Sequence, residues 1–191
     1  MVGLRDVEAL FLAHGKGHIW EHSKAVAEEI SLIAAQYGQP SETCRTAALC
    51  HDIAGILSPE DMLRQAMAEG ITLDPAEALH PFLLHQRFSC RICADRLGVT
   101  DQAALSAIGC HTTLKAGASA ADMALFLADK LRWDQKGPPP FEAAVRKALC
   151  GSLERACLAY MDYALETGMI LMPHRWLLEA RQWLIPFSVS F

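Results

Sequence analysis

The sequence has no apolar run that approaches the roughly 20 residues needed to cross a bilayer. Its first 18 residues contain acidic side chains and lack the layout of a signal peptide. Basic charge is also scarce, with 17 Lys and Arg against 22 Asp and Glu and a net charge of −5. Binding to nucleic acid or to an anionic membrane requires clustered Lys and Arg. We therefore expect a cytoplasmic protein without nucleic-acid or membrane partners.

The seven cysteines are an odd number and are scattered through the chain, which is not the pattern of a disulfide framework. Cys90 and Cys93 form a lone CxxC without the second pair that a structural zinc site uses. Burial of these thiols in a core is the favoured interpretation. A zinc or redox role for the pair stays open as the alternative.

Strand signals are absent, whereas apolar residues recur at helical spacing almost throughout, so the sequence predicts an all-α fold. Ser41, Ser58, Asp74, Thr100 and Ser119 stand where N-caps are expected. The predicted helices cover approximately residues 4–13, 17–38, 41–52, a stretch from 58, another from 74, 81–96, 100–111, a stretch from 119, 141–166 and 173–184.

The one Pro-rich interruption, residues 137–140, separates a part of the chain at about 18–135 from helices at about 141–186. Too few residues follow it to build a separate core. We therefore predict a single domain over residues 1–191, in which the last helices pack on the first part. Their apolar faces also allow a homodimer.

The adjacent pair His51 and Asp52 at the end of an Ala-rich helix is the clearest chemical signal. Consecutive helical residues lie about 100° apart, so the imidazole and the carboxylate can reach one cavity from two sides. They can then share a metal ion, and the second carboxylate oxygen can bridge to another ion.

Four further candidates, His22, His85, His111 and Asp129, are spaced along the chain around this pair. With His51-Asp52 they give the order H…HD…H…H…D. This order resembles the HD superfamily of metal-dependent phosphohydrolases. More narrowly, the chain is similar to the bacterial YqeK-type symmetrical diadenosine tetraphosphatases. The similar stretches are LCHDIAG, LLHQRFSCRICADRLGV, AIGCHTTL, FLADK and MPHRWLLEARQWL. On the Leu-Leu-His stretch it is His85, thirteen residues before Gly98, that matches, rather than His80.

The resemblance implies an HD-type helical bundle with a dinuclear metal site in its core. One ion would be held by His22, His51, Asp52 and Asp129, and the other by Asp52, His85 and His111. Four imidazoles and two carboxylates suit transition metals better than Mg or Ca. We therefore expect two divalent ions, Fe by preference, with Mn, Zn, Co and Ni as alternatives.

The resemblance also implies that diadenosine tetraphosphate is cleaved symmetrically to two ADP by a hydroxide that bridges the metals. Asp52 would be the catalytic residue, as the bridging ligand that positions this hydroxide. The substrate is a nucleotide or another small phosphate compound. Its candidate contacts are Thr112, Lys130, Arg45, Lys115 and Trp20.

Four positions depart from the basic residues that the family carries beside its ligands: Ile19, Gly55, Met123 and Gln135. Fewer cations mean fewer charge-assisted contacts to a polyphosphate chain. Two alternatives therefore stay open. One is a nucleotidase or phosphomonoesterase that acts on a smaller substrate at the same site, and the other is a nucleotide-binding protein with reduced turnover.

Overall fold

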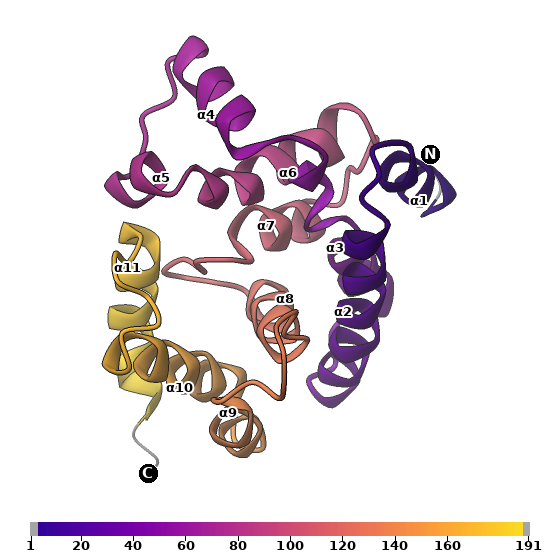
Figure 1. The fold of residues 1–191 in the computed structure, drawn as a ribbon. Coiled ribbons are helices and arrows are strands. Elements are labelled where there is room, and N and C mark those ends of the chain that lie inside the picture. Colours follow the sequence, from indigo (N-terminus) through magenta and orange to yellow (C-terminus); the bar gives the residue numbers. More distant parts are fainter. Residues whose placement is uncertain (1–3, 189–191) are drawn as a thin grey trace.

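The computed structural model describes residues 4–188, which fold into eleven α-helices and three short 3-10 helices without a strand (Figure 1). The prediction of an all-α fold is confirmed. The α-helices are α1 (Leu4–Ala13), α2 (Gly17–Gln36), α3 (Ser41–Cys50), α4 (Pro59–Ala68), α5 (Pro75–Leu79), α6 (His85–Asp95), α7 (Gln102–Cys110), α8 (Ala120–Leu131), α9 (Glu142–Leu149), α10 (Leu153–Glu166) and α11 (Arg175–Leu184). The 3-10 helices are η1 (Ile53–Ile56), η2 (Pro81–Leu84) and η3 (Ile185–Ser188).

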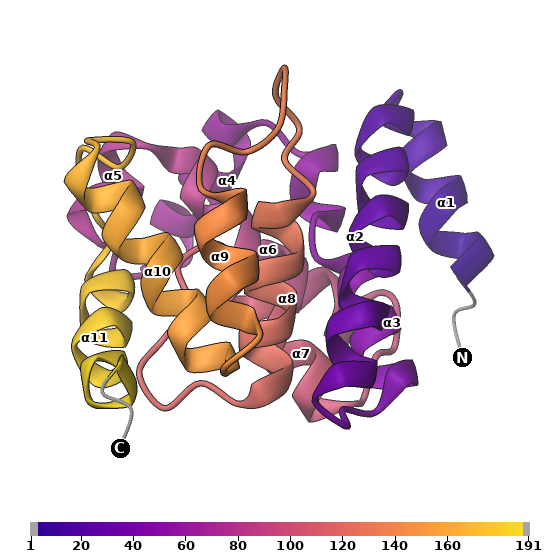
Figure 2. The ribbon, with the colours of Figure 1, turned by 90° about the horizontal axis from the view of Figure 1, so that it is seen from below.

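Helix α8 forms the centre of the molecule and packs against α2, α3, α7 and α10 (Figure 2). Residues 121–128 are all buried, because neighbouring helices cover every side of this apolar helix. Phe126 is fully buried, and its ring meets that of Tyr160 on α10 edge to face at 5.3 Å. One hydrophobic core extends from Val7 on α1 to Leu184 on α11. None of the helices in residues 4–188 is both long and apolar enough to span a bilayer.

Most of the predicted helix starts are confirmed. Ser58 caps α4, and both Asp74 and Ser119 form capping boxes with an acidic residue three positions on. The prediction for Thr100 is wrong, because Asp101 caps α7 and its carboxylate accepts hydrogen bonds from two backbone N–H groups. Ser41 is likewise not a cap, since it is the first residue of α3 after Pro40.

Two predicted helices are divided in the structure. The segment 141–166 forms α9 and α10, because Ser152 takes an extended conformation and its hydroxyl accepts a hydrogen bond from Arg155 N at 3.2 Å. This contact starts a new helix in a stretch whose apolar periodicity alone predicts one. The segment 81–96 begins with the tighter turn of η2 before α6 starts at His85.

Glu77 joins α5 to α6 and to the start of α11 although its side chain is fully buried. It accepts hydrogen bonds from Arg87 Nε at 2.9 Å and from Asp74 N at 2.8 Å, and His174 Nε2 lies 3.6 Å away. Burial raises the pKa of Glu77, but His174, the Asp74 N–H and Arg87 outweigh it and hold this pKa below its ordinary value. The ionised carboxylate therefore stabilises the contact between these helices.

We predict that Glu77→Gln lowers the free energy of unfolding at pH 7 by about 1–3 kcal/mol, because it removes a buried, hydrogen-bonded carboxylate. Because the pKa of Glu77 is lowered in the folded state, its carboxylate stabilises the fold at pH values above the ordinary glutamate pKa of about 4.3. This contribution disappears as the pH falls through the pKa of Glu77 in the folded protein. The difference between wild type and variant should therefore narrow below about pH 5.

Urea unfolding of the metal-free protein at a series of pH values measures this difference. Glu179→Gln is the control, because Glu179 is exposed on α11 and, among the described residues, pairs only with Arg175, at 3.6 Å. That variant should change stability by less than about 1 kcal/mol. A Glu77→Gln difference that stays constant from pH 7 to pH 4 would contradict the assignment.

Candidate metal centre

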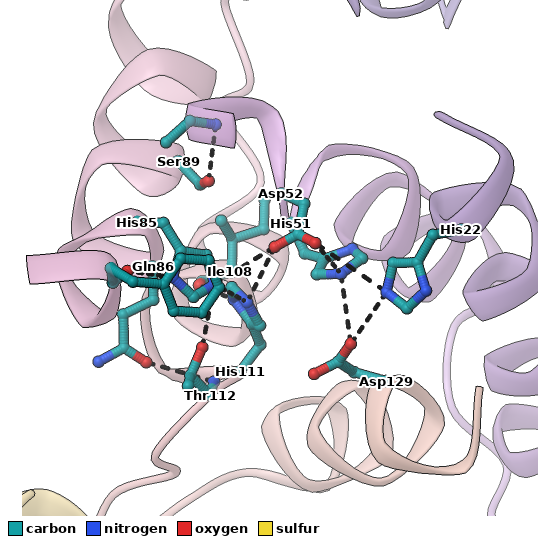
Figure 3. A network of polar contacts seen from close by, with 12 residues as sticks. His22, His51, Asp52, His85, Gln86, Ser89, Ile108, His111, Thr112 and Asp129 are labelled. Atoms are coloured by element: carbon teal, nitrogen blue, oxygen red, sulfur yellow. Dashed lines mark hydrogen bonds and ion pairs between the residues drawn. The ribbon is translucent and has the colours of Figure 1, made fainter. Parts of the chain in front are cut away.

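The six predicted ligands come together where the ends and faces of five helices meet (Figure 3). His51 and His111 directly follow the last residues of α3 and α7, and His85 is the first residue of α6. His22 projects from α2 and Asp129 from α8, on the side facing Asp52. Residues separated by up to 107 positions thus form one polar cluster in the core.

Asp52 lies at the middle of this cluster, and its two oxygens face different histidines. Oδ2 is 3.3 Å from His51 Nε2 and 4.0 Å from His22 Nε2. Oδ1 is 3.3 Å from His85 Nε2 and 3.4 Å from His111 Nε2. The carboxylate therefore connects two separate groups of ligand atoms, which is the arrangement that a bridging ligand needs.

Asp129 completes the first group from the opposite side. Its Oδ1 lies 3.1 Å from His22 Nε2 and 3.6 Å from His51 Nε2. Its Oδ2 accepts a hydrogen bond from Lys130 Nζ at 2.7 Å. One oxygen of Asp129 thus faces the cluster while Lys130 neutralises the other.

The backbone fixes the tautomer of three of the histidines. In each of them Nδ1 lies at hydrogen-bonding distance from the carbonyl three residues earlier, and since a carbonyl only accepts, Nδ1 carries the proton. The Nε2 lone pair is then directed into the cluster, as in histidines that bind metals. The contacts are His51 to Ala48 O at 2.7 Å, His85 to Phe82 O at 2.6 Å and His111 to Ile108 O at 2.8 Å.

These lone pairs provide the test of whether a metal fits. His51 Nε2 is buried and makes no hydrogen bond within residues 4–188, although Asp52 Oδ2 lies 3.3 Å away. His85 Nε2 and His111 Nε2 lie only 2.9 Å apart, although the tautomers make both of them acceptors. Two facing lone pairs repel each other unless a cation lies beside them. The donor set of imidazole nitrogens and carboxylate oxygens therefore fits a divalent transition metal.

The charges of the cluster suit the same role. Burial raises the pKa of Asp52 and of Asp129, but the surrounding imidazoles, together with Lys130 beside Asp129, hold both pKa values well below the ordinary range. Burial lowers the pKa of His111 to about 4. It also lowers the pKa of His51, but Asp52 and Asp129 outweigh it and raise that pKa well above its ordinary value, so a metal ion bound at His51 Nε2 would displace a proton from it. Both carboxylates are therefore ionised at neutral pH and attract a cation.

A cavity of about 610 Å³ opens onto the cluster. Five of the six candidate ligands line it, while His51 lies behind them. Its wall beyond the ligands is mostly apolar and includes Phe82, Trp133 and the segment 169–172 between α10 and α11. Lys130 is the only lysine or arginine among the described residues that line it.

The five predicted substrate contacts divide into two groups. Thr112 and Lys130 line the cavity, and Thr112 Oγ1 lies 3.1 Å from His85 Nε2. Trp20, Arg45 and Lys115 do not line it. A role for these three in binding substrate there does not agree with their positions.

Each of the three has another environment. Trp20 is buried against Phe11, and its indole N–H donates to the Glu8 carboxylate. Two positions along a helix rotate the side-chain direction by about 200°, so Trp20 points away from the side of α2 that carries His22. Arg45 is exposed on α3. Lys115 donates to Ser106 at 2.7 Å.

Sequence reasoning did not identify Gln86, which lies beside His85 and is fully buried. Its Oε1 faces Thr112 N at 3.3 Å and Thr113 N at 3.4 Å, so it fixes the turn that follows His111. Its position directly after a candidate ligand was the available signal. The sequence carries no signal for the cavity wall at 169–172, because only the packing of α11 brings this segment to the site.

The positions that depart from the family's basic pattern have different surroundings. A Cβ atom at Gly55 would lie 2.5 Å from Ile19 Cδ1, so the isoleucine fills the space that a side chain at 55 would need. Met123 is buried in the core, and Gln135 is exposed at the cavity.

Comparison with known proteins finds a matching family model and similar proteins. A family model described as HD domain matches residues 19–134. A protein of Lactococcus lactis subsp. cremoris, described as an uncharacterised protein in the pepC 5′ region, is 38% identical over 71% of this chain and 69% of its own length. A symmetrical bis(5′-nucleosyl)-tetraphosphatase of Halalkalibacterium halodurans is 26% identical over 65% of this chain and 66% of its own length.

A solved structure shares the fold over nearly the whole chain. It is described as a predicted HD superfamily hydrolase involved in NAD metabolism, from Clostridium acetobutylicum. It covers 98% of this chain and 99% of its own, with a TM-score of 0.87 and 24% identity. With the family model, this match accounts for the helical architecture. The chain belongs to the HD domain family, and it shares the fold of that Clostridium acetobutylicum protein.

Proposed function

We propose that this HD hydrolase cleaves dinucleoside tetraphosphates symmetrically, with diadenosine tetraphosphate giving two ADP. The observation that carries the proposal is the position of Asp52, whose two oxygens face two groups of metal-type ligand atoms. The name of the Halalkalibacterium halodurans relative supports this choice of substrate. The cavity next to the cluster provides space for one nucleotide half of the substrate.

The first group, which would hold one divalent ion, consists of His22, His51, Asp52 and Asp129. The second, which would hold another, consists of Asp52, His85 and His111. Bound there, such ions lower the pKa of a water molecule and neutralise phosphate oxygens. Fe is the metal we propose first, with Mn, Zn, Co and Ni as alternatives.

The chain's own side chains would orient the substrate. The Thr112 hydroxyl lines the cavity 3.1 Å from His85 Nε2, and it would be able to donate to a phosphate oxygen once that nitrogen holds a metal ion. Burial lowers the pKa of Lys130, but Asp129 outweighs it and raises this pKa, so the ammonium stays charged. From its position at the cavity, Lys130 can pair with Asp129 and attract the phosphate chain at the same time.

A smaller phosphomonoester is a second candidate, because the cavity has little positive charge. Lys130 is already paired with Asp129, and the other polar groups of the wall do not include another lysine or arginine among the described residues. A nucleoside monophosphate needs fewer cationic contacts than a chain of four phosphates. The same ligand cluster would serve either substrate.

Product analysis separates the two candidates. Protein loaded with Mn or Fe and incubated with diadenosine tetraphosphate should yield ADP as its nucleotide product. In water enriched in ¹⁸O, one labelled oxygen should enter for each pair of ADP molecules. ATP together with AMP would contradict symmetrical cleavage. Phosphate released from nucleoside monophosphates, without cleavage of the dinucleotide, would favour the second candidate.

We predict that Asp52→Ala loses both metal binding and turnover, because both groups share this carboxylate. Activity should fall by at least about 100-fold, since even the outer partners of metal sites cost 10–100-fold when they are changed. Asp134→Asn is the matched control, because Asp134 is an exposed carboxylate that lines the same cavity outside the cluster. Equal metal content in wild type and Asp52→Ala would contradict the bridging role.

His85→Ala and His80→Ala test the assignment of the second group. His85 Nε2 faces Asp52 Oδ1 at 3.3 Å, whereas His80 lines the cavity as an exposed residue outside the cluster. Metal analysis should show that His85→Ala loses one ion per chain and that His80→Ala keeps the wild-type content. The reverse result would place the ligand at His80.

A further inference from the structure

Phe82 on η2 is an exposed aromatic residue beside the metal centre. Its ring stacks on that of His85, with centroids 4.3 Å apart and an angle of 26° between the planes. Its carbonyl oxygen also accepts the Nδ1–H of the same histidine at 2.6 Å. Phe82 nevertheless remains 58% exposed and lines the cavity. One face of the ring thus covers a candidate ligand, and much of the rest is open.

Other exposed apolar side chains line the same cavity. Leu171 is 89% exposed and Met172 is 40% exposed, both in the connection between α10 and α11. This connection leads into α11, which Figure 1 shows next to α5 and the segment that carries η2. Asp74 on the α5 side accepts a hydrogen bond from Arg175 N at 3.2 Å and holds the start of α11 there. Beyond the ligands, the cavity therefore offers apolar and aromatic surface.

An exposed ring next to a phosphate-cleaving centre suits a flat aromatic group of the substrate. Bases stack on phenylalanine whatever their sequence identity, because every base has an aromatic face. Flexible methionine and leucine side chains can cover the second face of such a group. Phosphate groups, in contrast, would be directed to the ligand cluster and Lys130, where the charges are.

We propose that Phe82 is the stacking platform for the nucleobase of the substrate, with Leu171 and Met172 covering the opposite face. This inference rests on the proposed function, in that it assumes a nucleotide substrate at the same centre. It makes Phe82 a specificity residue, which selects nucleotides over phosphate compounds without an aromatic group. It also predicts tolerance toward the identity of the base.

Calorimetric binding of two probes to the Mn-loaded protein tests the platform. ADP carries a base and inorganic pyrophosphate does not. Phe82→Leu should weaken ADP binding about tenfold or more, the range expected for loss of base stacking, and leave pyrophosphate binding unchanged. Phe82→Tyr should keep the affinity for ADP. Leu79→Ala is the control, because Leu79 is 59% exposed nearby on α5 but does not line the cavity.

A second variant keeps the test independent of His85. Leu171→Ser should weaken ADP binding about threefold without a change in pyrophosphate binding, because an exposed leucine side chain contributes only part of a stacking contact. Equal losses of ADP and pyrophosphate in Phe82→Leu would overturn the proposal and make Phe82 a positioning residue for His85. Unchanged ADP binding in Phe82→Leu would also overturn it, as would a wild type that binds ADP no more tightly than pyrophosphate.

These outcomes are separate from failure of the proposed reaction. If the protein does not cleave diadenosine tetraphosphate but binds ADP through Phe82, the reaction is wrong and the platform stands. If it cleaves the dinucleotide and Phe82→Leu binds ADP normally, the platform is wrong and the reaction stands.

Discussion

The structure depends on one electrostatic constraint, the packing of an ionised carboxylate among the ring nitrogens of four histidines. Asp52 has a histidine Nε2 within 3.5 Å of each of its oxygens, and two of those nitrogens lie 2.9 Å apart as acceptors. Such a cluster is unfavourable in a hydrophobic core unless a cation compensates for it. The HD domain therefore places metal-type ligands where uncompensated polar groups would destabilise the fold.

The surrounding fold supplies the rigidity that this arrangement needs. Helix α8 is buried along most of its length, so Asp129 is fixed relative to the helices that carry the histidines. Backbone carbonyls at the ends of α3 and α7 hold His51 and His111 in one tautomer. Gln86 fixes the following turn. Helix ends thus orient the ligands with groups that a helix leaves without intrahelical partners.

The sequence predicts the helical class, because helical periodicity is a local signal, and the six residues predicted as ligands from the order of His and Asp lie together in the structure. Trp20, Arg45 and Lys115, which the sequence also predicts as substrate contacts, do not line the cavity, since proximity to a ligand along the chain does not decide which way a side chain points. The sequence also gives no sign of the cavity wall at 169–172, which depends on how α11 docks through Glu77 and Asp74. The break at Ser152 depends on a side-chain hydrogen bond that competes with the helix, and apolar periodicity does not reveal such a bond.

Substrate selection depends on residues beside the ligands rather than on the ligands themselves. Phe82 stacks on His85 at the cavity, and Ile19 fills the space beside Gly55, three residues after Asp52. The central claim is that Asp52 bridges two ions. Anomalous diffraction from crystals of the Mn-loaded protein tests it most directly. We expect two peaks, one beside Asp52 Oδ2 with His22, His51 and Asp129 and one beside Asp52 Oδ1 with His85 and His111. A single peak, or peaks away from Asp52, would contradict it.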